Sequence, residues 1–157
     1  MIQRLRFVFG VVLLGGASAS AQPRVGVVPG ASYAGVSGTT ICMSREGQLS
    51  GGCVFYEVRP FRGRASVQMH VDGLTANLRE TGRATTRTAY DREYRVTRTY
   101  SVQNYRAVDG SFTAELWTRS DDVEDGGDCG EMRGGVTVRK GGRQTHVRLE
   151  GSGCVFG

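Results

Sequence analysis

The stretch RASVQMHVDGLTANLRE, residues 64–80, decides the fold class predicted for this chain. Before its centre, apolar and polar residues alternate, and the apolar ones are Ala65, Val67, Met69 and Val71. This is the period of a β-strand and not of a helix. The central Asp72-Gly73 is typical of a type I′ turn, whose twist suits two right-twisted antiparallel strands. The stretch therefore predicts a β-hairpin.

The predicted register of this hairpin agrees with its apolar pattern. A two-residue loop produces three facing pairs: Val71 with Leu74, Met69 with Ala76, and Val67 with Leu78. All three pairs are apolar and lie on one face of the hairpin. Turn chemistry and face pattern are separate signals, and here they indicate the same structure.

Two further hairpins are predicted downstream. GVTVRKGGRQTHVRLE, residues 135–150, turns at Gly141-Gly142, which places Val138 opposite Thr145 and Val136 opposite Val147. Residues 93–106 join residues 111–119 through a three-residue loop, Val108 to Gly110. That loop places Val102 opposite Leu116 and Tyr100 opposite Thr118.

Upstream, residues 37–44 and 51–61 are predicted to be two strands joined around Gly51-Gly52, and Pro60 indicates a sheet edge or the end of a strand. Residues 22–38 are predicted to be a loose N-terminal arm or a first strand. With 24 glycines and no helical stripe outside the first 21 residues, the chain is predicted to be all-β. The expected architecture is an antiparallel sandwich or small barrel of about eight strands, stapled by disulfides. A membrane β-barrel is disfavoured, because arginine and glutamate fall on both faces of several strands.

The N-terminus has the pattern of a cleavable secretory signal. Arg4 and Arg6 precede an apolar run over residues 7–14, and Ala19-Ser20-Ala21 is an A-x-A cleavage site. Residues 1–21 are therefore predicted to be removed, which leaves residues 22–157 as a single β domain without a transmembrane span. The formal charge of +5 then falls to +3, which indicates little about partners. The predicted location is the periplasm or the extracellular space.

Four cysteines follow the signal: Cys42, Cys53, Cys129 and Cys154. In an oxidising compartment they are expected to form two disulfides. No pair has the C-x-x-C spacing of a zinc knuckle. Of the three possible connectivities, Cys42 with Cys53 and Cys129 with Cys154 is favoured, because each pair brackets glycine-rich turns.

An arginine-tyrosine segment, residues 83–106, contains six arginines and four tyrosines. Cations next to aromatic rings suit an anionic glycan or another anionic ligand. The predicted ligand-binding residues are Arg92, Tyr94, Arg95, Arg98, Tyr100 and Trp117. No single basic face is expected, because Arg95 falls on the opposite face of the strand from Arg98. Trp117 and several tyrosines, Tyr105 among them, are alternatively expected to line a barrel mouth or to fill the core.

The acidic stretch DDVEDGGDCGE, residues 121–131, raises the question of a metal site. Asp121, Asp125 and Asp128 are weak candidate calcium ligands. The spacing fails the EF-hand pattern, because Val123 and Met132 occupy two ligand positions. A solvated connection between strands is the favoured interpretation, and no cofactor is predicted.

No catalytic residue is predicted. His70 and His146 lie in different hairpins, each on the face opposite the apolar one, and no nucleophile or metalloprotease motif accompanies them. Glu57 and Glu115 cannot be placed relative to each other from sequence. The chain is therefore expected to be a non-enzymatic, exported binding or interaction domain for an anionic ligand or an envelope component. The alternative is an inhibitor or protective partner of a secreted lysozyme or protease; an intracellular nucleic-acid partner is not expected.

Overall fold

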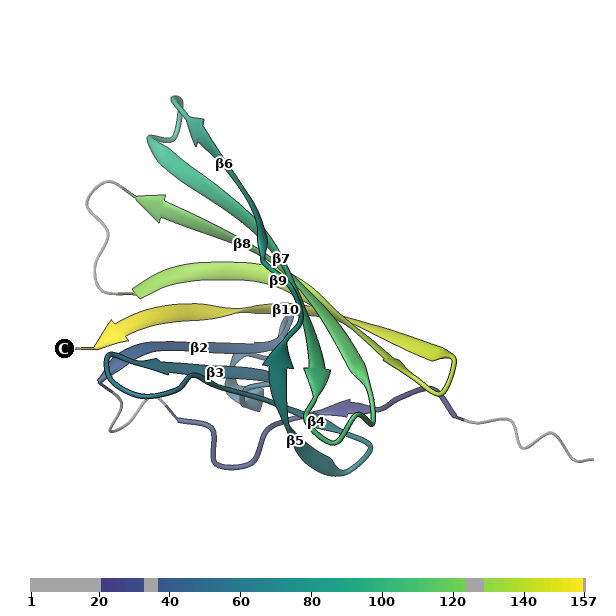
Figure 1. Cartoon of the computed structure of the whole chain (residues 1–157). Helices are drawn as coiled ribbons and strands as arrows, with labels where there is room; N and C mark the ends of the chain where they lie inside the picture. Colours follow the sequence, from purple (N-terminus) through teal and green to yellow (C-terminus); the bar gives the residue numbers. More distant parts are fainter. Residues whose placement is uncertain (1–20, 33–36, 124–128, 157) are drawn as a thin grey trace, which may run out of the picture.

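The computed structural model describes residues 21–32, 37–123 and 129–156 (Figure 1), and antiparallel strands dominate these residues. The predicted signal segment lies outside the described residues except for Ala21. The elements are β1 Val25–Gly26, β2 Gly38–Arg45, the 3₁₀ turn η1 Leu49–Gly51, β3 Phe55–Pro60, β4 Ser66–Val71, β5 Leu74–Glu80, β6 Thr85–Asp91, β7 Val96–Ala107, β8 Thr113–Val123, β9 Cys129–Lys140 and β10 Arg143–Phe156.

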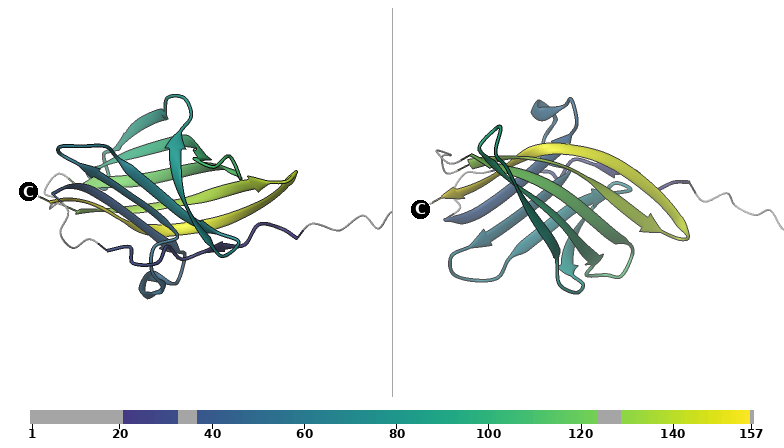
Figure 2. Two further views of the ribbon diagram at one scale, coloured as in Figure 1. Left: turned by 60° about the horizontal axis from the view of Figure 1, so that its bottom comes forward. Right: turned by 90° about the horizontal axis from the view of Figure 1, so that it is seen from above.

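Eight of these strands form a closed antiparallel barrel. The order is β2-β3-β4-β5-β7-β8-β9-β10, and β10 returns to pair with β2. The strands curve round a common interior (Figure 2). Closure pairs both edges of the barrel sheet, which protects them from edge-to-edge association. The predicted all-β class is confirmed, and the barrel is the observed form of the two architectures that were predicted.

The two hairpins with the clearest turn signals have the predicted register. Val67, Met69 and Val71 face Leu78, Ala76 and Leu74. Val136 faces Val147, and Val138 faces Thr145. Both central residues of each turn have positive φ, as a type I′ turn requires: Asp72 at 52°, Gly73 at 83°, Gly141 at 55° and Gly142 at 74°.

The predicted register of the β7–β8 hairpin is wrong by one residue. Val102 faces Trp117, and Leu116 faces Gln103 instead. The cause is Ser111, which belongs to the loop: its backbone N–H and its hydroxyl both donate to the Asp109 carboxylate, 3.0 and 2.7 Å away. Asp109 thus makes a local side-chain turn, and the extra loop residue moves β8 by one position along β7. Leu116 and Gln103 therefore point inward, whereas Trp117 and Val102 point outward.

The described part of the N-terminal arm, residues 21–32, packs against the barrel. Val25 and Gly26 form β1 and pair with Val71 and His70 of β4. Val25 and Val28 are buried, and the Val28 N–H donates to the Cys53 carbonyl over 2.7 Å. The arm continues along the outside of β3, where the Tyr56 hydroxyl donates to the Ser32 carbonyl. Pro60 is the last residue of β3, which confirms the predicted strand end.

One half of the barrel interior is filled by a packed apolar core. Its fully buried side chains include Met43, Phe55, Met69, Val136 and Val138. Gly151 of β10 permits a close approach of β2, because a Cβ at this position would lie 2.0 Å from the Cys42 carbonyl oxygen. The core lies toward the end of the barrel that bears the β4–β5 and β9–β10 turns.

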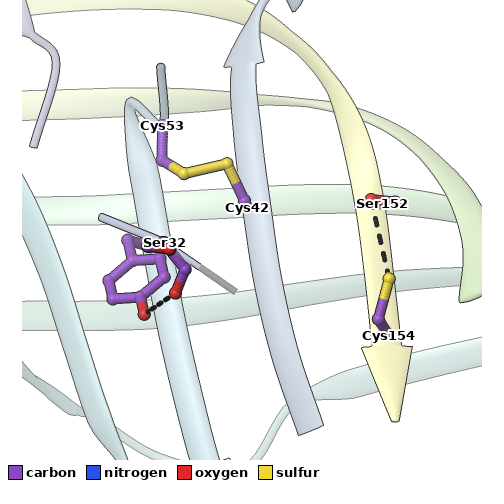
Figure 3. The surroundings of a disulfide bond; sticks show 6 residues. Ser32, Cys42, Cys53, Ser152 and Cys154 are labelled. Atoms are coloured by element: carbon purple, nitrogen blue, oxygen red, sulfur yellow. Dashed lines mark hydrogen bonds between the residues drawn. A yellow bond between two sulfur atoms is a disulfide. The ribbon is translucent and has the colours of Figure 1, made fainter. Parts of the chain in front are cut away.

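Both favoured disulfides are present, Cys42–Cys53 and Cys129–Cys154. Figure 3 shows the first, together with the Ser152 hydroxyl 3.9 Å from the Cys154 sulfur. Disulfides are compatible with a periplasmic or extracellular location. Among the described residues, no helix has the length and apolar character needed to cross a membrane.

β6 departs from the barrel. The first half of β7, residues 96–102, pairs with β6, and residues 105–107 at its end pair with β5. Gly82, with φ of 84°, lies in the connection between β5 and β6. The β6–β7 ribbon therefore projects beyond the barrel body (Figure 1), and β6 pairs with β7 but with no other described strand.

Candidate binding sites

The open half of the barrel contains a pocket of about 490 Å³. It lies at the end of the interior where β5 stops, beyond the packed core. Apolar walls come from Ile41, Leu116 and Met132. Polar groups come from β3, β5, β7 and the β5–β6 connection, and they include Glu57, Arg59, Glu80, Arg83, Gln103 and Tyr105. An eight-stranded barrel is wide enough to be filled by side chains or to hold one small ligand.

Glu57 is the least expected group in this pocket, because its carboxylate is inside the barrel. Its side chain is only 4% exposed. Strand alternation explains the position: Phe55, Glu57 and Arg59 point inward in turn, from the core toward the mouth. The Arg59 guanidinium bridges the carboxylates of Glu57 and Glu80. The Tyr105 hydroxyl lies 3.5 Å from the other oxygen of Glu57.

Burial perturbs both titratable partners. Desolvation raises the pKa of Glu57 above its usual value of 4.5, and the nearby Arg59 opposes this only in part. Burial, together with the charge of Glu57, also raises the pKa of Tyr105 strongly, so this phenol remains protonated and can donate a hydrogen bond. The pocket therefore contains a carboxylate whose ionised form is disfavoured by the fold.

Hydrogen-bond acceptors gather around Arg59 in the pocket. Two carboxylates share one guanidinium, that of Arg59. The Gln103 amide N–H₂ donates to the carbonyls of Asn104 and Gly82, which directs its oxygen to accept. The other arginine in the lining, Arg83, is exposed in the β5–β6 connection.

From the sequence, Glu57 and Glu115 were two carboxylates of unknown relative position. The structure separates Glu57 from Glu115, which lies on the outer face of β8 with its carboxylate 3.9 Å from Arg139. The two carboxylates therefore do not face each other. Of the aromatic residues considered for a barrel mouth, Tyr105 lines the pocket, whereas Trp117 and Tyr100 lie outside it. The available signal was the alternation of β3, which puts Glu57 and Arg59 on the same face as the core residue Phe55.

The predicted ligand-binding residues divide into two groups. Arg92, Tyr94 and Arg95 lie in the turn at the tip of the β6–β7 ribbon. Arg98 and Tyr100 lie on the outer face of β7, as does Trp117 on β8. The Arg98 guanidinium lies 6.0 Å from the centre of the Tyr94 ring and 3.2 Å from the Asp91 carboxylate.

A row of arginines does emerge, and it is built across strands. Directly facing residues form an outward row of Arg87 on β6, Tyr100 on β7, Arg119 on β8 and Arg133 on β9. We call these four residues the arginine row. Counting along one strand could not reveal it, because each strand contributes a single member.

Of the weak metal candidates, only Asp121 is described. Its carboxylate pairs with Arg119, 3.1 Å away, and lies 4.0 Å from Arg98. Asp125 and Asp128 lie outside the described residues, so the acidic stretch remains an untested prediction. Within the part of the chain that is described, no three His, Cys, Asp or Glu side chains gather as metal ligands.

His70 and His146 lie on the outer face of the barrel, as expected from their strand positions. Each Nδ1 is 3.0 Å from a threonine hydroxyl of the facing strand, Thr75 for His70 and Thr137 for His146. Neither histidine lines the pocket.

Comparison with known protein families, with curated proteins and with solved structures finds no match to this chain. Function must therefore be inferred from the two sites themselves.

Proposed function

We propose that this protein is a non-enzymatic binding domain that holds a small ligand in the open half of its barrel. The observation that supports this proposal is Glu57, a buried carboxylate at a pocket that the core does not fill. A buried charge destabilises a fold unless it is compensated. The other half of the same barrel is apolar, so the polar half is not required by the architecture.

The lining favours a ligand with a cationic or N–H-rich head and an apolar body. Glu57, Glu80 and the Gln103 oxygen would accept hydrogen bonds from an ammonium or amidine group. Ile41, Leu116 and Met132 would contact the apolar remainder. Glu57 is already held by Arg59 and Tyr105, and this arrangement suits binding better than proton transfer.

The test compares two small molecules of similar shape and opposite charge, phenethylamine and 3-phenylpropionate, by their effect on the thermal midpoint of the full chain. A ligand at about a hundred times its dissociation constant stabilises by about 2.7 kcal/mol, which raises the midpoint by several degrees. We expect this rise with the amine and not with the acid.

Two variants make the test specific to the pocket. Glu57→Gln removes the carboxylate, and Ser101→Phe fills space at the lining, so both should abolish the rise. Glu115→Gln is the matched control, because it removes a carboxylate from the outer face and should leave the rise intact. A rise that persists in Ser101→Phe, or no rise in the unaltered protein, would contradict the proposal.

A further inference from the structure

We propose a second binding site outside the barrel: the arginine row, together with Trp117, binds an anionic polysaccharide. This inference is independent of the pocket, because it concerns the outer face of β6, β7, β8 and β9. It rests on the cross-strand alignment of charges, on their incomplete pairing within the protein, and on an exposed indole beside them.

The arginine row forms a continuous track perpendicular to the strands. Arg87 faces Tyr100, Tyr100 faces Arg119, and Arg119 faces Arg133. Neighbouring strands are about 4.8 Å apart, so the row extends over about 14 Å. A row of this length suits an extended chain better than a single small anion.

Positive charge along the row is only partly neutralised. Arg119 has Asp121 as its partner, 3.1 Å away. Arg133 faces Glu150 on β10, whose carboxylate accepts a hydrogen bond from the Gly47 N–H. Neither Arg87 nor Arg133 forms an ion pair with a described residue. Arg119 and Arg133 also face each other directly, and like charges at facing positions repel. An anion bound along the row would relieve this repulsion.

Trp117 lies in the adjacent row, opposite Val102 on one side and Gly135 on the other. Gly135 leaves room for the ring: a Cβ there would lie 2.7 Å from the indole Nε1 and 2.8 Å from the His146 ring. Trp117 is 39% exposed, and its indole N–H makes no hydrogen bond with any described residue. It therefore offers both an apolar ring surface and an unused donor.

A shallow groove of about 260 Å³ joins the two rows. Trp117 lines it together with Arg119, Arg133 and Arg148, and the only acidic residue in its lining is Glu46. The Arg148–Glu46 pair is long, 3.7 Å, and both side chains are mostly exposed, so Arg148 remains available to a ligand.

Acidic polysaccharide is the ligand class that uses all of these features. Its sugar rings present C–H groups to an aromatic face, and its carboxylates or sulfates accept paired hydrogen bonds from guanidinium groups. A single-stranded nucleic acid would use successive aromatic platforms for successive bases. Here each of the two adjacent rows that form the site contributes one ring, Tyr100 and Trp117.

The chain contains one tryptophan, so its fluorescence reports directly on this site. We would titrate the full chain with polygalacturonate, using dextran as the neutral polysaccharide. Polygalacturonate should change the Trp117 emission, and the apparent affinity should fall steeply between about 50 mM and 500 mM NaCl. Dextran should have no effect.

The decisive variant is Arg87→Gln combined with Arg133→Gln, because both side chains are exposed and neither supports an ion pair of the described fold. We expect the affinity to fall by about tenfold for each arginine. The matched control is Arg62→Gln with Arg64→Gln, which removes the same charge from the exposed β3–β4 connection and should leave the affinity nearly unchanged.

Three results would overturn the inference. The first is an unchanged emission at all salt concentrations, and the second is an equal loss of affinity in the control variant. The third is equally tight binding of single-stranded DNA through the same two arginines, which would assign the row to nucleic acid. Because Glu57→Gln leaves the outer face unaltered, failure here and failure of the pocket proposal are distinguishable.

Discussion

At the scale of single residues, Glu57 links the packed core to the open pocket. It follows Phe55 on the inward face of β3, where an apolar residue would have continued the core. Its ionised form is stabilised by Arg59 and Tyr105 but is still disfavoured by burial, since its pKa is raised. Under the proposed function, a cationic ligand would complete the compensation that Arg59 begins.

Glu57→Gln should change how stability depends on pH. The folded pKa is above the unfolded value of 4.5, so the folded state binds the proton more tightly. Below pH 4.5 the group is protonated in both states and has no effect; as the pH rises through the folded pKa, its ionisation destabilises the folded protein. The variant should therefore gain stability relative to the unaltered protein from acidic to neutral pH.

Urea unfolding across this pH range measures that difference. Comparison with Glu115→Gln separates burial from simple loss of charge, because Glu115 lies on the outer face. If the change in stability caused by Glu115→Gln depends on pH as steeply as the change caused by Glu57→Gln, the burial of Glu57 inside the barrel is not the cause of the pH dependence.

At the scale of elements, the turns and disulfides hold the ladders in register. The type I′ turns fix the β4–β5 and β9–β10 hairpins, and Asp109 fixes the β7–β8 hairpin one residue from the expected register. The Cys129–Cys154 bond joins facing residues at the far end of the β9–β10 ladder from its turn. This long hairpin is therefore secured at both ends.

Replacing Cys129 and Cys154 together by serine should reduce the free energy of unfolding by about 3 kcal/mol, because the bond restricts the unfolded chain. The same change at Cys42 and Cys53 should cost less, since that bond spans 11 residues instead of 25. Denaturant unfolding of the two double variants shows which one loses more free energy of unfolding. The reverse order would mean that packing in the folded state, and not chain entropy, dominates.

At the scale of the whole molecule, the N-terminal arm and the barrel share one core. Val25 belongs to the same buried cluster as Phe55 and Val136. The arm is also tied to the β4–β5 turn and to β10: the Arg24 N–H donates to Asp72, and the Thr145 hydroxyl donates to the Pro23 carbonyl. We therefore expect arm and barrel to unfold together.

Val28→Ala should lower the free energy of unfolding by about 2 kcal/mol, because the two buried methyl groups of the valine side chain are lost and a cavity remains. Its neighbour Val27 is 42% exposed, so Val27→Ala is a matched control with a much smaller effect. Both variants should retain a single transition in urea when followed by fluorescence and by circular dichroism. Two separate transitions would show that the arm unfolds independently.

The sequence by itself determined the features that depend on neighbours along the chain. Asp72-Gly73 and Gly141-Gly142 specify turns whose geometry is local, and strand alternation then assigns each residue to a face, so two hairpins and the positions of both histidines could be predicted. The favoured disulfide pairing was also correct.

Only the tertiary structure decided what depends on several strands at once. Closure of β10 on β2 made a barrel instead of a sandwich, and the early end of β5 opened the pocket around Glu57. The arginine row was hidden for the same reason, since Arg87, Arg119 and Arg133 meet only through registers between strands distant in sequence. Even one loop residue, Ser111, changed which of Leu116 and Trp117 faces the interior, because a shift of one residue exchanges the two faces of a strand.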